Sequence, residues 1–208
     1  MQKVKEKNLL LIFTRNPELG KCKTRLAATI GDHAALEVYQ TLLNHTVRIT
    51  KDLDITKEVH YSVKVRENDI WDNHIYHKKQ QDGEDLGQRM KNAFQNGFTN
   101  GYTNIIIIGS DMYDLNQEDI ENAFRALQDH EYVIGPAMDG GYYLLGMKRM
   151  NSEVFENKDW GTETVLKSTL NDLQQTNIKL LEERNDIDYY EDIKDISAFQ
   201  HLLSYQND

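Results

Sequence analysis

The chain has few residues that cross-link or interrupt a fold, and it has no long hydrophobic run. Its one cysteine, Cys22, excludes an internal disulfide, and its two prolines are Pro17 and Pro136. The longest apolar runs, at 9–13 and 105–108, are far shorter than the roughly 18 residues of a membrane span. No apolar segment of signal-peptide length follows the basic N-terminus. We therefore expect a cytoplasmic protein without a membrane span.

Positive charge is also scarce. The chain has 24 Lys and Arg against 34 Asp and Glu, and its formal net charge is −10. Because nucleic-acid binding requires a basic face, this balance argues against a nucleic-acid partner. The 208 residues are 39% hydrophobic and 28% charged, which is typical of a globular protein with one full core. We expect a single domain over residues 1–208, and the oligomeric state stays open.

Strand and helix patterns alternate along the chain. Helices are expected from Asp32, and at 85–98, 118–128, 162–173 and 190–203. Strands are expected at 9–14, 58–65, 105–108, 132–135, 141–147 and 178–181. This alternation predicts an α/β protein with a mainly parallel central sheet and helices on both faces.

Four consecutive isoleucines at 105–108 form the clearest strand. A β-branched run without polar alternation is typical of a strand buried on both faces. Gly109, Ser110 and Asp111 follow directly, and ligands of open α/β sheets bind beyond the carboxyl ends of strands. Asp111 is therefore well placed to hold a divalent cation and, through it, a phosphate. A helix cap or a turn is the alternative, because a helix is expected soon afterwards.

A basic loop follows the first expected strand. Gly20 to Leu26 is not a P-loop, because Arg15 stands where that motif requires its first glycine. A strand that leads through a glycine into a helix N-terminus nevertheless favours an anion, and Lys and Arg side chains bind phosphate. The pattern predicts a phosphate-binding loop, with a solvated basic turn as the alternative. Its cations are Arg15, Lys21, Lys23 and Arg25.

Two later segments combine ligand-binding residues with an ordinary structural explanation. Gly140 and Gly141 beside Asp139 allow a ligand to approach the backbone closely. The same residues also form a satisfactory turn between two strands. Trp160 precedes an expected helix and either lines an acceptor pocket or packs in the core.

Two acidic segments favour helix capping. Asp85 is placed as an N-cap residue, with Arg89 as its surface partner one turn later. Asp188 and Glu191 have the spacing of a capping box. Taken alone, neither segment indicates a functional site.

In their order along residues 8–195, these motifs resemble a bacterial family of nucleotide-diphospho-sugar transferase-like proteins. Members are described as glycosyltransferases associated with radical SAM proteins or as a domain of unknown function. The motifs are Arg15 with Pro17, Gly20 with Lys23, Thr24, Arg25 and Leu26, the segments 81–90, 109–111 and 135–142, Trp160 with Thr162 and Thr164, and the segment 186–188.

This chain departs from the family pattern at two places. The family usually has Asp-Cys-Pro-Asp-Leu after its central strand, whereas Met112 and Tyr113 follow Asp111 here. Leu19 replaces a second proline in the first loop. Because the metal-binding Asp is retained, the departures concern the sugar or acceptor side, and the nucleotide side is intact.

The resemblance implies a GT-A fold, a nucleotide ligand and Mg²⁺ or Mn²⁺. The expected activity is metal-dependent transfer of a sugar from a nucleoside-diphosphate sugar to a small acceptor. Asp111 is expected to hold the metal together with Asp188, and Asp139 to act as general base or to contact the sugar, with Lys23 as the third catalytic residue. The residues expected to bind the nucleotide are Arg15, Gly20, Lys23, Thr24, Arg25, Gly83, Leu86, Gly87, Arg89 and Ser110.

Two other functions stay open. The first is nucleotidyl transfer, in which a nucleoside triphosphate reacts with a phosphorylated small molecule and releases pyrophosphate. The segment 23–26 also resembles the guanylyltransferase that acts on phospholactate, but the loop at 15–21 holds only one glycine to cradle a triphosphate. The second is a non-catalytic nucleotide-binding module, which the intact Asp111 and Asp139 disfavour.

Overall fold

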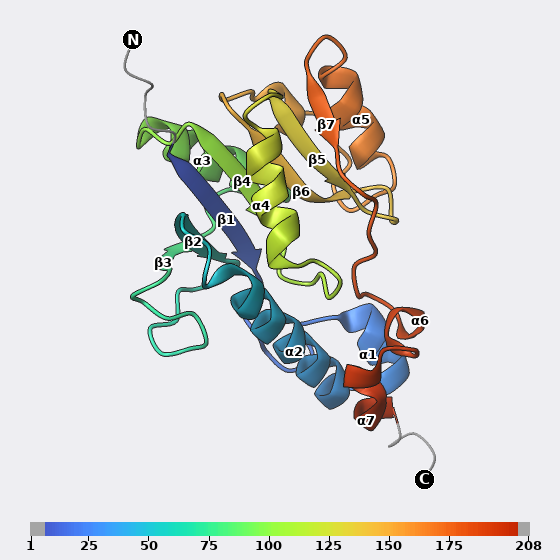
Figure 1. The fold of residues 1–208 in the computed structure, drawn as a ribbon. Coiled ribbons are helices and arrows are strands. Elements are labelled where there is room, and N and C mark those ends of the chain that lie inside the picture. The colour runs from blue at the N-terminus through green and yellow to red at the C-terminus, as the bar shows by residue number, and fades with distance from the viewer. Residues whose placement is uncertain (1–6, 204–208) are drawn as a thin grey trace.

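The fold is built around one sheet of seven strands. A computed structural model describes residues 7–203, and Figure 1 shows the arrangement of its elements. The strand order is β3-β2-β1-β4-β6-β5-β7. All strands run in one direction except β6, which is antiparallel to β4 and β5. The strands are β1 (Asn8–Thr14), β2 (Thr56–Tyr61), β3 (His77–Gln80), β4 (Asn104–Ile108), β5 (Tyr132–Pro136), β6 (Tyr142–Met147) and β7 (Ile178–Leu180).

Helices cover both faces of this sheet, as predicted. One face carries α1 (Thr24–Ile30), α2 (Asp32–Thr50), α4 (Gln117–Ala126), α6 (Tyr190–Ile193), α7 (Gln200–Leu203) and the 3-10 helix η2 (Ser197–Phe199). The other carries α3 (Leu86–Thr99), α5 (Val165–Asp172) and the 3-10 helix η1 (Glu153–Phe155). The mainly parallel α/β sheet expected from the sequence is confirmed.

The isoleucine strand is the centre of both cores. Ile106 and Ile108 join the core beneath α2 and α4, whereas Ile105 and Ile107 join the core beneath α3. All four are at most 4% exposed. Because side chains alternate across a strand, a strand with helices on both sides needs apolar residues at every position. Each fully buried isoleucine contributes about 1.5–3 kcal/mol.

The second expected strand, 58–65, ends early. β2 stops at Tyr61 because the Asn16 side chain replaces the sheet partners of the next residues. Its Oδ1 accepts hydrogen bonds from the backbone N–H groups of Val63 and Lys64, and its Nδ2 donates to the Lys64 carbonyl. This clamp turns the chain away from the sheet beside the loop that follows β1.

One strand was missed and one expected helix was wrong. β3 was not predicted, because this edge strand, His77–Gln80, is polar and partly exposed and therefore lacks an apolar pattern. The expected helix 190–203 is divided into α6, η2 and α7, because the backbone at Ile196 is extended. Ile193, Ile196, Phe199 and Leu202 recur every three residues in this segment and pack in or against the core, which explains the prediction of one helix.

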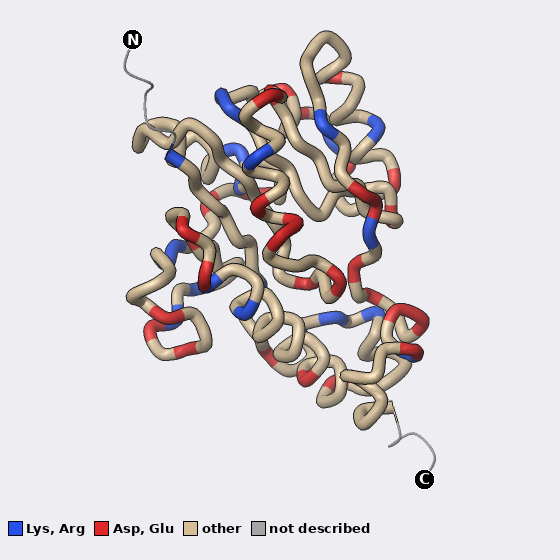
Figure 2. Tube along the Cα trace, in the orientation of Figure 1, with Lys and Arg blue, Asp and Glu red and all other residues tan. Residues whose placement is uncertain are grey.

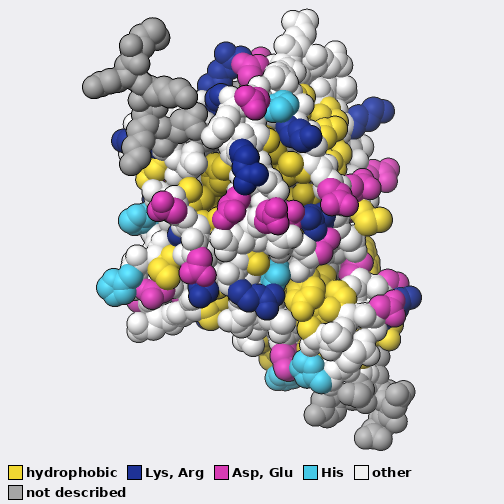
Figure 3. Space-filling model, viewed as in Figure 1, with side chains coloured by type: hydrophobic (Ala, Val, Ile, Leu, Met, Phe, Trp, Pro, Cys, Tyr) yellow, Lys and Arg dark blue, Asp and Glu magenta, His cyan; other side chains and the backbone are white. Residues whose placement is uncertain are grey.

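Two further observations concern the helices and the surface. Within residues 7–203, no helix combines the length and hydrophobicity needed to cross a membrane. On the face seen in Figure 3, acidic and basic side chains are interspersed and form no continuous basic surface.

Candidate active site

The parallel pairing of β1 with β4 places two loops at the same edge of the sheet. Ile12 pairs with Ile108, so the chain leaves both strands side by side. The buried Tyr39 of α2 joins the loops. Its hydroxyl accepts a hydrogen bond from the Arg15 N–H at 2.9 Å and lies 3.4 Å from the Ser110 hydroxyl. The basic loop and Asp111 are therefore held together by a residue that the sequence did not single out.

A space of about 570 Å³, here called the charged pocket, opens between these loops. It brings together most of the residues expected to bind the nucleotide. Gly20, Gly83 and Gly87 do not line it. Of the site residues expected from the sequence, those that line it are Arg15, Lys23, Thr24, Arg25, Leu86, Arg89, Ser110, Asp111 and Asp188.

Lys23 is the centre of the charged pocket. Its side chain is only 7% exposed, and its Nζ lies 3.0 Å from Asp111 Oδ2 and 3.9 Å from Asp188 Oδ1. Burial alone would lower the pKa of Lys23, but the charge and hydrogen bond of Asp111 outweigh burial and raise it. The backbone of Lys23 is left-handed, with φ of 49°, a conformation that costs a non-glycine residue about 1–3 kcal/mol. Such strain is typical of functional sites.

Asp188 lines the charged pocket and does not cap a helix, because the N-cap of α6 is Tyr189. Its carboxylate lies 2.7 Å from Arg25 Nη1. The capping prediction was wrong, because Asp192 accepts the backbone N–H groups of Asp188 and Tyr189 at 2.9 and 2.6 Å. Figure 2 shows the resulting arrangement, with cationic positions before α1 facing acidic positions of the segment that leads to α6.

The glycines at the start of α3 shape the site without lining it. Asp85 caps this helix, as predicted, by accepting the Gln88 N–H at 2.8 Å. Arg89 instead donates from Nε to the Gly83 carbonyl at 2.9 Å. Gly83 has φ of 140°, and a Cβ there would lie 2.8 Å from the Arg89 nitrogen. A side chain at Gly83 would therefore displace the backbone that holds Arg89.

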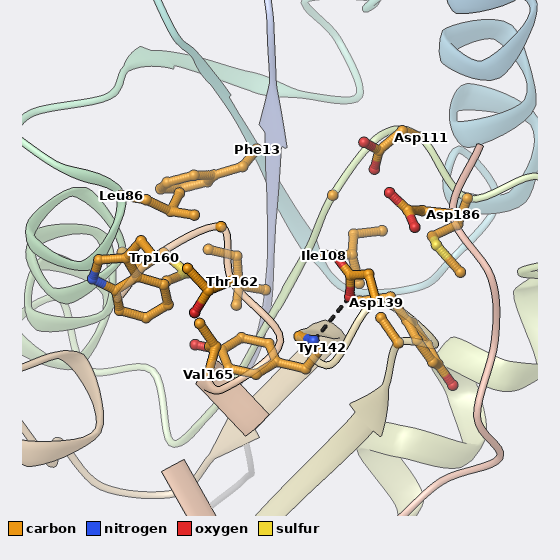
Figure 4. Close-up of a pocket in the computed structure, with 18 residues that line it drawn as sticks. Phe13, Leu86, Ile108, Asp111, Asp139, Tyr142, Trp160, Thr162, Val165 and Asp186 are labelled. Atoms are coloured by element: carbon orange, nitrogen blue, oxygen red, sulfur yellow. Dashed lines mark hydrogen bonds between the residues drawn. The ribbon is translucent and has the colours of Figure 1, made fainter. Parts of the chain in front are cut away.

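A second space of about 280 Å³, here called the apolar cavity, adjoins the charged pocket. The two share Phe13, Leu86, Gly109 and Asp111. Figure 4 shows carboxylates at one end and apolar side chains at the other. Asp139 is exposed there, and its Oδ1 accepts the Gly141 N–H at 2.8 Å. The cavity is lined by Phe13, Leu86, Met90, Ile107, Ile108, Gly109, Asp111, Met112, Ala137, Asp139, Gly141, Tyr142, Tyr143, Trp160, Gly161, Thr162, Val165 and Asp186.

The two residues that depart from the family pattern have separate surroundings. Met112 is buried and lines the apolar cavity. Tyr113 packs in the core, with ring centroids 5.1 Å from both His45 and Phe199. Of the two, Met112 alone contacts the candidate site.

Asp186 is a candidate functional residue that the sequence reasoning missed. It lines the apolar cavity, and Figure 4 shows its carboxylate close to that of Asp111. Burial, reinforced by the charge of Asp111, raises the pKa of Asp186 to about 6, although Lys23 opposes the rise. The signal was present at 186–188, where Ile187 is 2% exposed. An apolar residue between two acids places both acids on the opposite side of an extended segment.

The carboxylates fit a divalent cation in their chemistry. Within residues 7–203, no three His, Cys, Asp or Glu side chains are grouped so that they alone could hold a metal ion. Asp111 and Asp186 nevertheless supply the oxygen ligands that Mg²⁺ and Mn²⁺ prefer, and Mg²⁺ is commonly held by one or two carboxylates together with substrate phosphates. Burial and, after it, the charge of Asp111 raise the pKa of Asp186, and a bound cation would offset both by favouring the charged carboxylate.

Replacing Asp186 with asparagine is expected to change the pH dependence of stability. Because the folded-state pKa is raised from 3.8 to about 6, the folded protein binds this proton more tightly than the unfolded chain does. Ionisation of Asp186 therefore reduces the free energy of unfolding as the pH rises from 4 through 6. The Tm of Asp186→Asn should equal that of the wild type near pH 4 and exceed it at pH 7. Equal values throughout this range would contradict the prediction.

Replacing Tyr39 with phenylalanine is expected to loosen the basic loop. The change removes the acceptor of the Arg15 N–H and the donor to the Arg15 carbonyl, at 2.9 and 3.0 Å. Loss of a buried hydroxyl of this kind costs about 1–3 kcal/mol, which lowers the Tm of a protein of this size by roughly 2–12 °C. Thermal unfolding followed by circular dichroism measures the change. Tyr132→Phe is the control, because it removes a buried hydroxyl that is bonded to Asn151 and not to the basic loop.

Comparisons with known proteins support the same fold. A proposed nucleotide-diphospho-sugar transferase from Desulfovibrio desulfuricans G20 is 28% identical, with a TM-score of 0.84 over 96% of this chain and 95% of that one. A search of curated proteins finds no match.

Two more distant structures share the fold alone. The 4-diphosphocytidyl-2C-methyl-D-erythritol synthase of Anaerococcus prevotii DSM 20548 is 9% identical, with a TM-score of 0.60 over 96% of each chain. Rv0371c of Mycobacterium tuberculosis H37Rv, in complex with manganese, is 12% identical, with a TM-score of 0.56 over 95% of this chain and 98% of that one. The predicted nucleotide-diphospho-sugar transferase fold is confirmed.

A family model also matches the chain directly. It is described as an uncharacterized protein conserved in bacteria, DUF2064, and it matches residues 42–162. Since this is more than half of the 208 residues, the chain belongs to the DUF2064 family.

Proposed function

We propose that the protein is a metal-dependent glycosyltransferase that moves a sugar from a nucleoside-diphosphate sugar to a small acceptor. The observation that carries this proposal is the junction of two spaces at Asp111. One space is rich in cations and suits a diphosphate, and the other is largely apolar and suits a second substrate. The similarity to the Desulfovibrio protein supports a transferase that uses a nucleotide sugar.

The cations of the charged pocket are proposed to bind the diphosphate. Arg15, Lys23 and Arg25 line a space large enough for it, and Arg89 lines the same space. Arginine adds bidentate hydrogen bonding to phosphate oxygens, and the buried ammonium of Lys23 adds a fixed charge. Their attraction would stabilise the charge that grows on the leaving diphosphate.

The remaining nucleotide contacts come from smaller groups. Thr24 and Ser110 line the charged pocket and present hydroxyl groups, and Leu86 presents an apolar surface. Gly20, Gly83 and Gly87 are proposed to act through the backbone shape that they permit. Gly20 and Gly83 have φ of 71° and 140°, and Gly87 packs beneath the indole of Trp160.

Asp111 and Asp186 are proposed to hold Mg²⁺ or Mn²⁺. When bound, the cation would neutralise charge on the diphosphate and act as a Lewis acid. Asp188, the second ligand expected from the sequence, is paired with Arg25 and lies near Lys23, so we place it in an outer position. The manganese complex of Rv0371c supports a cation in a protein of this fold.

Asp139 is proposed to act as the general base. It lies at the acidic end of the apolar cavity, and one of its oxygens is fixed by the Gly141 N–H at 2.8 Å. This hydrogen bond would hold the carboxylate in place beside a substrate hydroxyl. We also propose that the protein acts in the cytoplasm, where nucleotide sugars are made.

A thermal-shift screen separates this proposal from its alternatives. The full chain is tested against diphosphate sugars and triphosphates of each common base, with and without Mn²⁺. A ligand that binds only the native state raises the apparent Tm. We expect the largest shift with a diphosphate sugar and Mn²⁺. A larger shift with a triphosphate, together with pyrophosphate release, would support nucleotidyl transfer, and no shift with any nucleotide would support a non-catalytic module.

A further inference from the structure

The apolar cavity has acidic groups but no basic group in its lining. Asp111, Asp139 and Asp186 line it, and no Lys, Arg or His of the described chain does. Lys23 and Arg25 line the charged pocket instead. One side of the site therefore attracts anions, and the other side repels them.

This charge distribution restricts the second substrate. The Lys23 ammonium is committed to Asp111 and Asp188, at 3.0 and 3.9 Å. A cation held by Asp111 and Asp186 would neutralise those two groups, and Asp139 would still face an incoming anion. A phosphate or carboxylate in the cavity would lose its water and gain no cationic partner.

The opposite end of the cavity is aromatic and aliphatic. Figure 4 shows Phe13, Trp160 and Val165 at that end. Trp160 lies edge-on to Tyr142, with ring centroids 6.5 Å apart. Its indole packs directly against Gly87, where a Cβ would collide with it. A wall of this kind favours a flat or apolar ligand, and the cavity volume of about 280 Å³ suits a small one.

A sugar ring fits this wall poorly. Buried sugar hydroxyls need hydrogen-bond partners, and the wall offers few neutral ones. The Tyr142 hydroxyl has no partner within the described residues, but it is buried away from solvent. Thr162 donates to the Asp159 carbonyl at 2.8 Å, and Tyr143 donates to the Glu182 carbonyl at 3.1 Å. The donor sugar therefore belongs near the carboxylates, which leaves the apolar wall for the acceptor.

We infer that the acceptor is a small alcohol with an uncharged, ring-bearing body, and not a phosphorylated or carboxylated molecule. This inference rests on the proposed glycosyl transfer and adds the chemical class of the second substrate. The acceptor oxygen forms a bond to the anomeric carbon while the bond from that carbon to the diphosphate oxygen breaks. The nucleoside diphosphate leaves with the electron pair, and Asp139 accepts the hydroxyl proton.

Matched small molecules test this inference on the full chain. Benzyl alcohol is the uncharged probe, 4-(hydroxymethyl)benzoate is its anionic counterpart, and glucose is the sugar probe. Saturation-transfer NMR titrations, with and without Mn²⁺ and pyrophosphate, measure their dissociation constants. We expect benzyl alcohol to bind, and the benzoate to bind roughly tenfold more weakly. Equal or tighter binding of the benzoate, or binding of glucose in place of benzyl alcohol, would overturn the inference.

Two variants test where the probes bind and whether Asp139 repels the anionic probe. Asp139→Asn should reduce the difference between the two ring probes, whereas Asp129→Asn, an exposed aspartate that lines neither space, should leave it unchanged. Val165→Phe should abolish binding of benzyl alcohol and preserve that of pyrophosphate. Unaltered probe binding in both Asp139→Asn and Val165→Phe would place the probes elsewhere and overturn the inference. Because the preference among the probes is also measured without Mn²⁺ and pyrophosphate, it can be judged separately from the proposed function. Failure of Mn²⁺ and pyrophosphate to bind would count against the proposed function.

Discussion

Asp111→Asn is expected to lower kcat/KM for the donor selected by the thermal-shift screen by about a thousandfold. The change removes the carboxylate at which the two spaces meet and to which Lys23 is bonded at 3.0 Å. The loss should fall mainly on kcat, because the charge on the leaving diphosphate is greatest in the transition state. Release of the nucleoside diphosphate at varied Mn²⁺ concentration measures the effect.

Asp114→Asn is the matched control for this variant. Asp114 lies in the same loop, pairs with Arg184 at 3.6 Å and lines neither space, so its loss should leave turnover within about twofold of the wild type. If Asp111→Asn kept its Mn²⁺-dependent binding and turnover, the assignment of Asp111 would be wrong.

Lys23→Met is expected to destabilise the ligand-free protein and to weaken binding of pyrophosphate by more than about a hundredfold. The substitution removes the buried cation between Asp111 and Asp188. Breaking a fully buried pair costs about 3–5 kcal/mol, and we expect about 2 kcal/mol here because Asp111 is 39% exposed. Thermal unfolding and isothermal calorimetry measure the two effects.

Lys21→Met is the matched control, since Lys21 is in the same loop but is 73% exposed and pairs with Glu18. It should change the free energy of unfolding by less than about 0.5 kcal/mol. Lys23→Met should also bind Mn²⁺ alone more tightly, because the ammonium no longer competes for Asp111. The double variant Lys23→Met/Asp111→Asn should recover part of the lost stability, since Asp111 no longer carries an uncompensated charge. Strictly additive losses would show that the two groups do not interact.

Local sequence determined the elements that frame the site. The isoleucine run at 105–108 predicted the central strand because only a strand covered on both sides needs apolar residues at every position. The N-cap at Asp85 was also predictable, because an N-cap bond joins residues three positions apart. The position of Asp111 follows from the same strand, since ligand sites of parallel sheets lie at strand ends. These inferences required no knowledge of distant residues.

Tertiary structure decided which charged groups meet. Lys23 reaches Asp111 across 88 positions, and Arg25 reaches Asp188 across 163, so no local pattern specifies either pair. The burial of Asp186 and the bond from Tyr39 to the basic loop likewise depend on chain crossings in the sheet. The sequence alone determined strands, caps and candidate acids, because these depend on neighbours. Only the fold decided which acids are paired, buried or available, because desolvation and charge act through space.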